Sequence, residues 1–156
     1  MLEIAIPGLR TLRLEYLVLD YNGTLAVDGK LIEGVTERLQ ALSQQLTILV
    51  VTADTFGKAR SALAGMPCQL EVLPAPGQDQ AKLAYVQCLG CERVAAVGNG
   101  RNDRLMLEVA ALGIAVIGQE GASAETLTVA QVVAPHINNA LDLLLNPLRL
   151  VATLRS

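Results

Sequence analysis

Three polar segments of the sequence each follow an apolar run, and each holds residue types that handle phosphate. Asp20 opens D-Y-N-G-T-L, Thr52 opens T-A-D, and residues 98–103 read G-N-G-R-N-D. A carboxylate can attack phosphorus as a nucleophile. A hydroxyl and the backbone N–H groups of a glycine loop can hold phosphoryl oxygens. Each segment alone fits a turn or a helix cap, but the three together predict one site for phosphoryl transfer.

Such a site also needs positive charge near the transferred group, from a lysine and from Mg²⁺ held by carboxylate and carbonyl oxygens. Lys82 is the candidate lysine, and its alternative role is a solvated charge on a helix. Lys58 follows the T-A-D segment and is a weaker candidate. Lys30 lies in the loop after Asp20.

The elements that must position these residues form a strand–helix pattern. Strands are expected at 16–20, 47–51, 94–97, 114–117 and 132–133, mostly as apolar runs without alternation. That pattern is typical of parallel strands covered on both faces. Ligands bind beyond the carboxyl ends of such strands, where the three polar segments fall. We therefore predict an α/β fold built on one doubly wound, Rossmann-like parallel sheet.

The rest of the chain fits around that sheet as a single domain, 1–156, because its length is that of one domain. Helices are expected at 35–46, 56–63, 80–89, 104–110 and 139–145. Residues 2–6 and 11–14 predict a small N-terminal β-hairpin joined by Pro7-Gly8. Beyond Pro147 we expect a short packed tail.

Composition excludes several classes of protein. Apolar residues make up 52% and charged residues 17%, which excludes disorder. Aromatic residues are 3% and the net charge is −3, so no nucleic-acid surface is expected. No apolar stretch approaches the roughly 20 residues of a membrane span, and we expect a cytoplasmic protein without a membrane partner. Cys88 and Cys91 lack a second metal-binding pair, so a structural role is expected for them.

At these residues the chain resembles the haloacid dehalogenase (HAD) superfamily of phosphohydrolases and phosphotransferases, above all the phosphorylation domain of P-type ATPases and its small soluble relatives. D-Y-N-G-T-L is similar to the first motif, D-x-D-G-T-L in phosphatases and D-K-T-G-T-L in the ATPases. T-A-D is similar to the T-G-D of the ATPases, Lys82 matches the third motif, and G-N-G-R-N-D is similar to G-D-G-x-N-D. The resemblance implies a HAD-like fold over nearly the whole chain.

The resemblance also implies roles. Asp20 would be the nucleophile that forms an aspartyl-phosphate, with Asn22 in the general acid position. Thr52 would bind the phosphoryl group, and Lys82 would stabilise both Asp20 and the phosphate. The implied Mg²⁺ ligands are Asp20, Asn22 through its carbonyl, Asn99 and Asp103. The implied phosphate or substrate contacts are Gly23, Thr24, Ala53, Asp54 and Asn102.

Two amides depart from the phosphatase pattern. Asn22 replaces the aspartic acid that donates and recovers a proton, which an amide cannot do. General acid–base catalysis is worth about 10²–10⁴-fold, so we expect slow hydrolysis. Asn99 replaces a carboxylate linked to Mg²⁺, so we expect weaker metal binding. Asp54 could supply part of the missing charge, or could cap a helix.

The spacing of the motifs leaves no room for a cap domain, since strand–helix units fill both intervals, 20–52 and 52–82, where caps are inserted. Residues 26–31 would then form the only lid. We expect a phosphorylated substrate, either a small molecule or a macromolecule, and a homo-oligomer could cover the open site.

Two other functions remain open. The two amides, at 22 and 99, also fit a catalytically weak module that binds phosphate or a phosphoprotein and acts in regulation. A receiver domain of two-component signalling shares an Asp, a Thr and a Lys at strand ends. However, receivers place the phosphorylated Asp later than the first core strand, which argues against that reading.

Overall fold

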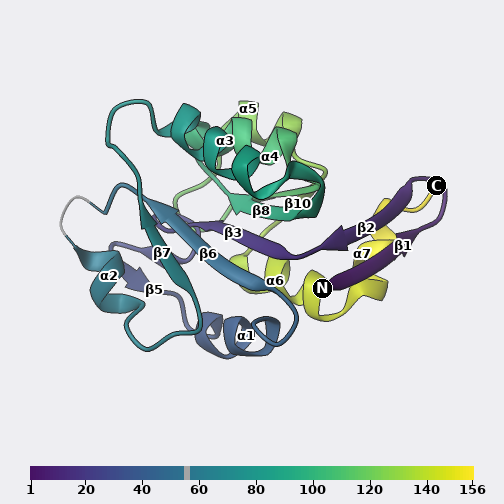
Figure 1. Cartoon of the computed structure of the whole chain (residues 1–156), viewed down its shortest axis with the longest axis horizontal. Coiled ribbons are helices and arrows are strands. Elements are labelled where there is room, and N and C mark those ends of the chain that lie inside the picture. The colour runs from purple at the N-terminus through teal and green to yellow at the C-terminus, as the bar shows by residue number, and fades with distance from the viewer. Residues whose placement is uncertain (55–56) are drawn as a thin grey trace.

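The computed structural model, which describes residues 1–54 and 57–156, has a six-stranded parallel sheet at its centre (Figure 1). The strand order is β10-β9-β8-β3-β6-β7. The strands are β3 (Tyr16–Asp20), β6 (Thr47–Thr52), β7 (Gln69–Val72), β8 (Val94–Gly98), β9 (Leu112–Val116) and β10 (Val132–Ala134). Because β3 is hydrogen-bonded to β6 on one side and to β8 on the other, the three polar segments emerge side by side.

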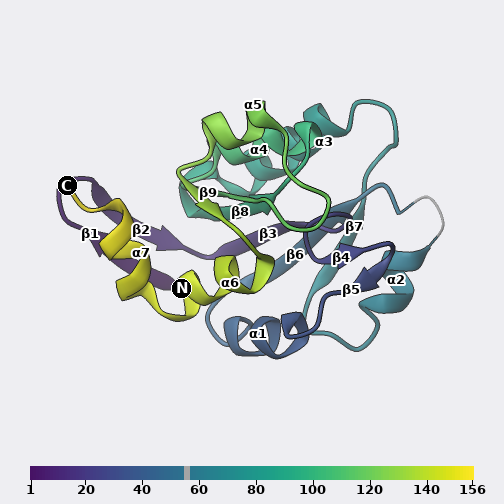
Figure 2. The same cartoon turned by 180° about the vertical axis from the view of Figure 1, so that it is seen from behind.

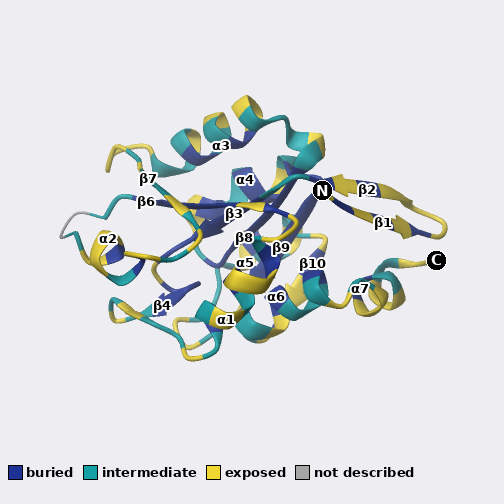
Figure 3. Ribbon diagram, turned by 60° about the horizontal axis from the view of Figure 1, so that its bottom comes forward, coloured by how far each residue is buried: buried dark blue, intermediate teal, exposed yellow. Residues whose placement is uncertain are grey.

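Helices cover both faces of this sheet, as predicted. Neighbouring residues of a strand point to opposite faces, and in β3 Leu17 and Leu19 join one apolar cluster while Val18 joins the other. The first cluster includes residues of α1 (Val35–Leu42) and α6 (Ile137–Leu145), and the second includes residues of α3 (Gln78–Leu89) and α4 (Arg104–Val109). The strands are therefore buried between two helical layers (Figure 3), which is why their sequences do not alternate.

The N-terminal hairpin consists of β1 (Leu2–Ile6) and β2 (Arg10–Leu14), paired antiparallel. It extends from one end of the domain and packs against α7 (Pro147–Leu154), so that both chain termini lie at this end (Figure 2). The short tail expected after Pro147 does pack against the domain, but it does so as a helix, which we did not predict. Proline is well tolerated in the first turn of a helix because its missing N–H needs no partner there, and here it begins α7.

Other element predictions were incomplete. The helix expected over 35–46 ends at Leu42, and a turn follows it in which Leu46 is still buried. Of the helix expected at 56–63, the structure describes α2 (Lys58–Ala62), while Phe56 lies outside the described residues. Neither β7 nor α5 (Ala124–Val129) was predicted. Strand β7 lies at the sheet edge and is only partly buried, so it lacks the apolar run of the inner strands.

The segment expected to act as a lid is a small hairpin of β4 (Ala26–Val27) and β5 (Lys30–Leu31). Between β3 and β6 the chain otherwise adds α1, and between β6 and α3 the described residues add α2 and β7. The described ranges therefore contain no inserted cap domain. Within them, no helix has the length and apolar character needed to cross a membrane.

The packing of α7 makes a testable prediction. Leu150 is fully buried, whereas Leu148 on the same helix is 83% exposed. We expect Leu150→Ala to lower the free energy of unfolding by about 2–5 kcal/mol, and Leu148→Ala to change it by less than about 0.5 kcal/mol. Urea denaturation of both variants checks this, and equal effects would contradict helical docking of the C-terminal segment.

Candidate active site

A polar cleft of about 260 Å³ opens at the carboxyl ends of the central strands. Asp20 ends β3 and Thr52 ends β6, while the loop after β8 supplies the opposite wall. The residues that line the cleft are Asp20, Asn22, Thr52, Ala53, Gln78, Lys82, Asn99, Gly100 and Asn102. Three segments and a lysine that are distant in the sequence therefore meet at one place, as expected from parallel strands.

Lys82 is the central cation of this cleft. It lies on α3, is 1% exposed, and its Nζ is 2.7 Å from Oδ1 of Asp20 and 2.7 Å from Oδ1 of Asp103. A buried ammonium is tolerated only when carboxylates compensate for its lost hydration. Lys82 thus joins α3 to the end of β3 and to the end of the loop after β8. Its alternative role, a solvated charge on the surface of a helix, is excluded.

The second oxygen of Asp20 is held by a hydroxyl. Oγ1 of Thr24 lies 3.1 Å from Oδ2 of Asp20 and 3.3 Å from Oδ1 of Asn99, and it has one proton to donate to either. Nδ2 of Asn99 donates to the carbonyl of Gly121 at 3.1 Å, and the Asn99 carbonyl accepts from the N–H of Ser123 at 2.9 Å. Asn99 therefore connects the loop after β3, which holds Thr24, to the loop that precedes α5.

Glycine is required at two positions by close approach. A Cβ on Gly23 would lie 2.6 Å from Nδ2 of Asn99, and the φ of Gly23 is +78°, which favours glycine. A Cβ on Gly98 would lie 2.5 Å from Cγ of Asp103. Gly23 thus lets the first and fourth motifs touch, and its contact with phosphate stays a prediction.

Asp103 is fully buried, and both of its oxygens are engaged. Oδ1 accepts from Lys82, and Oδ2 accepts from the backbone N–H groups of Asn99 at 3.0 Å and Gly100 at 2.9 Å. The carboxylate therefore fixes Lys82 and the loop after β8. These bonds favour a positioning role for Asp103, and the role of metal ligand that the resemblance implied stays a prediction.

The oxygens that remain fit a weakly held Mg²⁺. Asp20 supplies a carboxylate, Asn99 an amide oxygen and Asn22 a main-chain carbonyl, all hard donors of the kind Mg²⁺ prefers. Only one of the three is charged. No group of three His, Cys, Asp or Glu side chains able to hold a metal ion occurs in the parts of the chain that the structure describes.

Asp54, the other carboxylate suggested for this site, caps a helix. Its Oδ1 accepts from the N–H of Ala59 at 2.8 Å and its Oδ2 accepts from that of Arg60 at 3.2 Å, at the start of α2. Its own N–H lies 3.3 Å from Oγ1 of Thr52, which keeps the Thr52 hydroxyl proton free to donate. The φ of Asp54 is +41°, so the cap is formed at some cost in strain.

Gln78 lines the cleft but was not predicted. It begins α3, and its side-chain Nε2 donates to the carbonyls of Leu73 and Pro74. No motif marked it in the sequence, since a glutamine at the start of a helix is ordinary. Asn102, which was predicted, is exposed and lies at the rim of the cleft.

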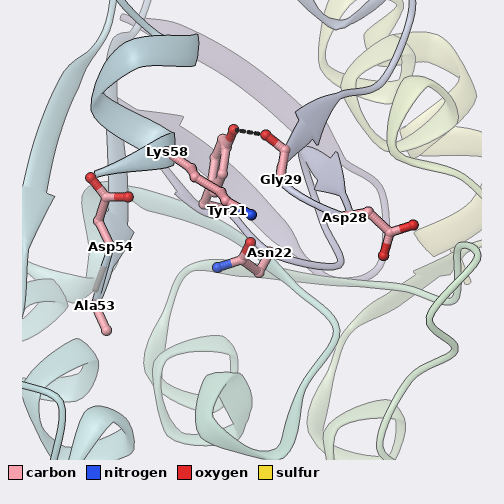
Figure 4. A pocket seen from close by; sticks show the side chains of 7 residues that line it. All are labelled: Tyr21, Asn22, Asp28, Gly29, Ala53, Asp54 and Lys58. Atoms are coloured by element: carbon pink, nitrogen blue, oxygen red, sulfur yellow. Dashed lines mark hydrogen bonds between the residues drawn. The ribbon is translucent and has the colours of Figure 1, made fainter. Parts of the chain in front are cut away.

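A second pocket of about 340 Å³ adjoins the cleft beneath the β4–β5 hairpin (Figure 4). Both pockets share Asn22 and Ala53. Lys58 packs over Gly29, where a Cβ would lie 2.8 Å from Cδ of the lysine. The hydroxyl of Tyr21 donates to the Gly29 carbonyl at 3.1 Å and so ties the hairpin turn to the nucleophile loop.

The surroundings of Asp20 change its acidity. Burial and the nearby charge of Asp103 raise the pKa of Asp20 to about 6, against the opposing effects of Lys82 and Thr24. Burial alone would lower the pKa of Lys82, but the two carboxylates outweigh it and the pKa is raised. Lys82 thus stays charged, while Asp20 takes up a proton near pH 6 in the metal-free protein.

This raised pKa predicts a pH-dependent stability. Between the unfolded value of 3.8 and the folded value of about 6, the native carboxyl of Asp20 holds more proton than the unfolded one. Stability should therefore fall as pH rises through that range, by at most about 1.4 kcal/mol per pH unit. We expect the wild type to lose stability relative to Asp20→Asn between pH 4 and 6 in urea denaturation with chelator. A flat or rising difference would contradict the raised pKa.

The contacts of Asn99 make a prediction about stability. If Asn99 were only a weakened metal ligand, Asn99→Asp would not destabilise the metal-free protein, whereas the contacts of the amide predict that it does. In Asn99→Asp, a carboxylate oxygen would face the Gly121 carbonyl in place of the donating Nδ2. We expect a loss of about 1–3 kcal/mol in the free energy of unfolding without metal. Asn102→Asp, on an exposed side chain of the same loop, should cost less than about 0.5 kcal/mol. Equal stability of Asn99→Asp and wild type would show that the amide is not needed there.

Comparisons with known proteins agree with this geometry. No protein-family model matches the chain. Two uncharacterised proteins of Methanocaldococcus jannaschii are similar to parts of it. MJ0073 is 53% identical over 64 residues, which is 41% of this chain and 69% of that protein. MJ0072 is 51% identical over 39 residues, which is 25% of this chain and 89% of that protein.

Solved structures share the fold at low sequence identity. The 3-deoxy-D-manno-octulosonate 8-phosphate phosphatase of Moraxella catarrhalis has a TM-score of 0.67 at 17% identity, covering 85% of this chain and 86% of its own. The cobalt-bound Haemophilus influenzae phosphatase (YrbI) has a TM-score of 0.71 at 14% identity, covering 86% and 88%. The catalytic domain of the CPx-ATPase CopB-B matches more loosely, with a TM-score of 0.59 at 19% identity, covering 73% and 46%.

These neighbours are phosphatases of the HAD superfamily and an ATPase catalytic domain, which the first, second and fourth motifs had indicated. The chain therefore has the capless fold of the HAD superfamily, and it belongs to the same protein family as MJ0073 and MJ0072 of M. jannaschii.

Proposed function

We propose that the protein is a slow, Mg²⁺-dependent phosphohydrolase or phosphotransferase that acts through an aspartyl-phosphate on Asp20. The observation that carries this proposal is the position of Asp20. It ends the central strand at the floor of the cleft, with one carboxylate oxygen on Lys82 and the other on Thr24. These two contacts hold the carboxylate in a fixed orientation, as an efficient nucleophile requires.

In the first step, an oxygen of Asp20 attacks phosphorus and the bond from phosphorus to the leaving oxygen breaks. Lys82 offsets negative charge on the carboxylate and the transferred group. The Thr52 hydroxyl is a donor available to the phosphoryl oxygens, whereas the backbone N–H groups of Asn99 and Gly100 already donate to Asp103. In the second step, water attacks phosphorus and the bond to Asp20 breaks, which restores the carboxylate and releases phosphate.

Asp20, Asn99 and the main-chain carbonyl of Asn22 would hold Mg²⁺, which when bound would supply positive charge to offset the negative charge of the phosphate. The M. catarrhalis phosphatase with this fold was solved with magnesium, phosphate and its sugar acid, which supports a divalent metal and a phosphorylated small molecule here. With a single charged ligand, we expect a metal affinity below that of sites with several carboxylates.

Asn22 explains why turnover should be slow. Its side chain reaches both pockets, in the position from which a phosphatase protonates the leaving oxygen. An amide cannot give up that proton. The leaving group must then be acidic enough to depart unprotonated or must take its proton from water, and the water of the second step lacks a base. Substrates with good leaving groups should be favoured.

The same two amides favour the alternative function, a regulatory module that binds phosphate. This alternative predicts a different experimental result. A module that only binds phosphate would be stabilised by inorganic phosphate while its turnover stayed at background. The neutral side chains of Asn22 and Asn99 leave less negative charge to repel such an anion when metal is absent.

The proposal is tested by turnover of an aryl phosphate with Mg²⁺. We expect the wild type to be active, Asp20→Ala to be at background, and Asn22→Asp to be about 10²-fold faster or more because it restores an acid and base. Asn139→Asp, at an exposed position on α6, serves as the control for an added carboxylate away from the cleft. If the turnover of both the wild type and Asn22→Asp were no higher than that of Asp20→Ala, the proposal of an enzyme would be contradicted. The phosphate-binding module would then be the remaining function.

A further inference from the structure

A third pocket, of about 300 Å³, adjoins the cleft on the side of α3 and α4. It shares Gln78 and Asn102 with the cleft, so the two pockets form one continuous surface. Its other walls come from Gly77 and Asp79 at the start of α3 and from two arginines, Arg101 and Arg104. A ligand whose phosphate lies on Asp20 would therefore extend past Gln78 and Asn102 toward two guanidinium groups.

The donors of this arginine pocket are incompletely satisfied. Nε of Arg104 is buried and has no hydrogen-bond partner. Both guanidiniums contact Glu125 only at 3.4–3.5 Å, longer than the roughly 2.7–2.9 Å of a strong charge-assisted bond. Glu125 is half-exposed and does not line the pocket, so these pairs are weak.

The start of α3 adds backbone donors to the same pocket. Its N-cap is Gly77, which offers no side-chain cap, and a Cβ there would meet open space. Within the described ranges, no hydrogen bond is found from the backbone N–H of Gln78 or of Asp79. Asp79 is the one carboxylate on the wall, and its Oδ1 accepts from the N–H of Gln80 at 2.8 Å. The helix terminus thus supports the arginines in attracting an anion.

The pocket beneath the β4–β5 hairpin has the opposite character. Its wall carries two carboxylates, Asp28 and Asp54, against one ammonium, Lys58. A second anion on the ligand would be repelled there and attracted by the arginines. This difference in charge would orient a bound ligand. Its uncharged part would lie on the side of the β4–β5 hairpin, and a further negative charge would lie on the side of the arginines.

We propose that the arginine pocket is a subsite for a second oxyanion, so that the substrate is a small phosphomonoester that also carries a carboxylate or another phosphate. This inference rests on the proposed function, since it places the first phosphate on Asp20. Arg104, whose guanidinium is the less exposed of the two, is the main contact through its terminal nitrogens, and the more exposed Arg101 is the second.

A matched pair of probes tests this subsite, because 3-phosphoglycerate differs from glycerol 3-phosphate by a carboxylate in place of a hydroxymethyl group. Binding is measured by calorimetry with Mg²⁺ in an Asp20→Asn background, which prevents turnover. We expect 3-phosphoglycerate to bind about tenfold or more tightly than glycerol 3-phosphate, as a charge-assisted arginine contact would give. Adding Arg104→Gln should remove most of that preference.

Two controls of equal charge change accompany this variant. Arg149→Gln removes an exposed charge on α7 and should leave the preference intact. Lys58→Gln removes the cation of the hairpin pocket and should also leave it intact. The subsite would be refuted if the two probes bound equally or if the preference survived Arg104→Gln. It would also be refuted if the preference were lost in Lys58→Gln.

The kcat/KM ratio of the two probes in the protein with Asp20 separates this inference from the proposed function. A ratio that falls about tenfold in Arg104→Gln supports both. Turnover of both probes with a ratio unchanged by Arg104→Gln would refute the subsite and leave the enzyme. A binding preference that depends on Arg104, without turnover of any phosphomonoester, would support the subsite and refute the enzyme.

Discussion

The bridge from Lys82 to two carboxylates is the interaction on which the site depends. A buried ammonium is stable only with anionic partners, and here they come from the end of β3 and from the loop after β8, each at 2.7 Å. The bridge therefore fixes α3 against the sheet as well as the charge in the cleft. Asp103 completes it by accepting two backbone N–H groups of the glycine loop. Removal of Lys82 would leave two buried carboxylates without a cation, whereas removal of either carboxylate would leave a single ion pair.

A second constraint is the close contact between the nucleophile loop and the loop after β8. Because Gly23 has no side chain, it leaves room for the side chain of Asn99. Asn99 in turn is hydrogen-bonded to Gly121 and Ser123 in the loop before α5. An amide serves this contact because it accepts at one end and donates at the other. The departure from an acidic motif at this position thus has a structural cause, and its expected consequence is a metal site with little negative charge.

The sequence predicted the sheet, its buried strands and the place of the cleft, because unbroken apolar runs and strand-end polar segments are local signals. It did not predict β7, whose partly exposed residues lack such a run, or the helical form of the segment after Pro147, where the proline begins α7 just after the end of α6. The meeting of Asp20, Thr52 and the loop at 98–103 was predicted from topology, and Lys82 was predicted from the need for a cation and from the resemblance. The bonds of Asp103 to Lys82 and to the glycine loop were not predicted, because hydrogen-bond partners depend on three-dimensional packing. The helix cap formed by Asp54 was one of the two roles considered for it.

The cleft has no cap domain over it within the described residues. Selectivity must then come from the walls of the adjoining pockets. The hairpin pocket is closed on one side by Tyr21 and Gly29, and the arginine pocket stays open at the start of α3. Their unlike charges give an open site a way to orient a small ligand.

The central claim is that Asp20 carries the phosphoryl group, and mass spectrometry after acid quench tests it most directly. Protein is mixed with acetyl phosphate and Mg²⁺, quenched, digested and searched for a gain of about 80 Da, the mass of a phosphoryl group replacing a proton. The account predicts this gain on the peptide containing Asp20, at lower occupancy in Asn22→Asp because hydrolysis is faster there. A modified peptide that lacks Asp20, or a gain that persists in Asp20→Asn, would contradict it.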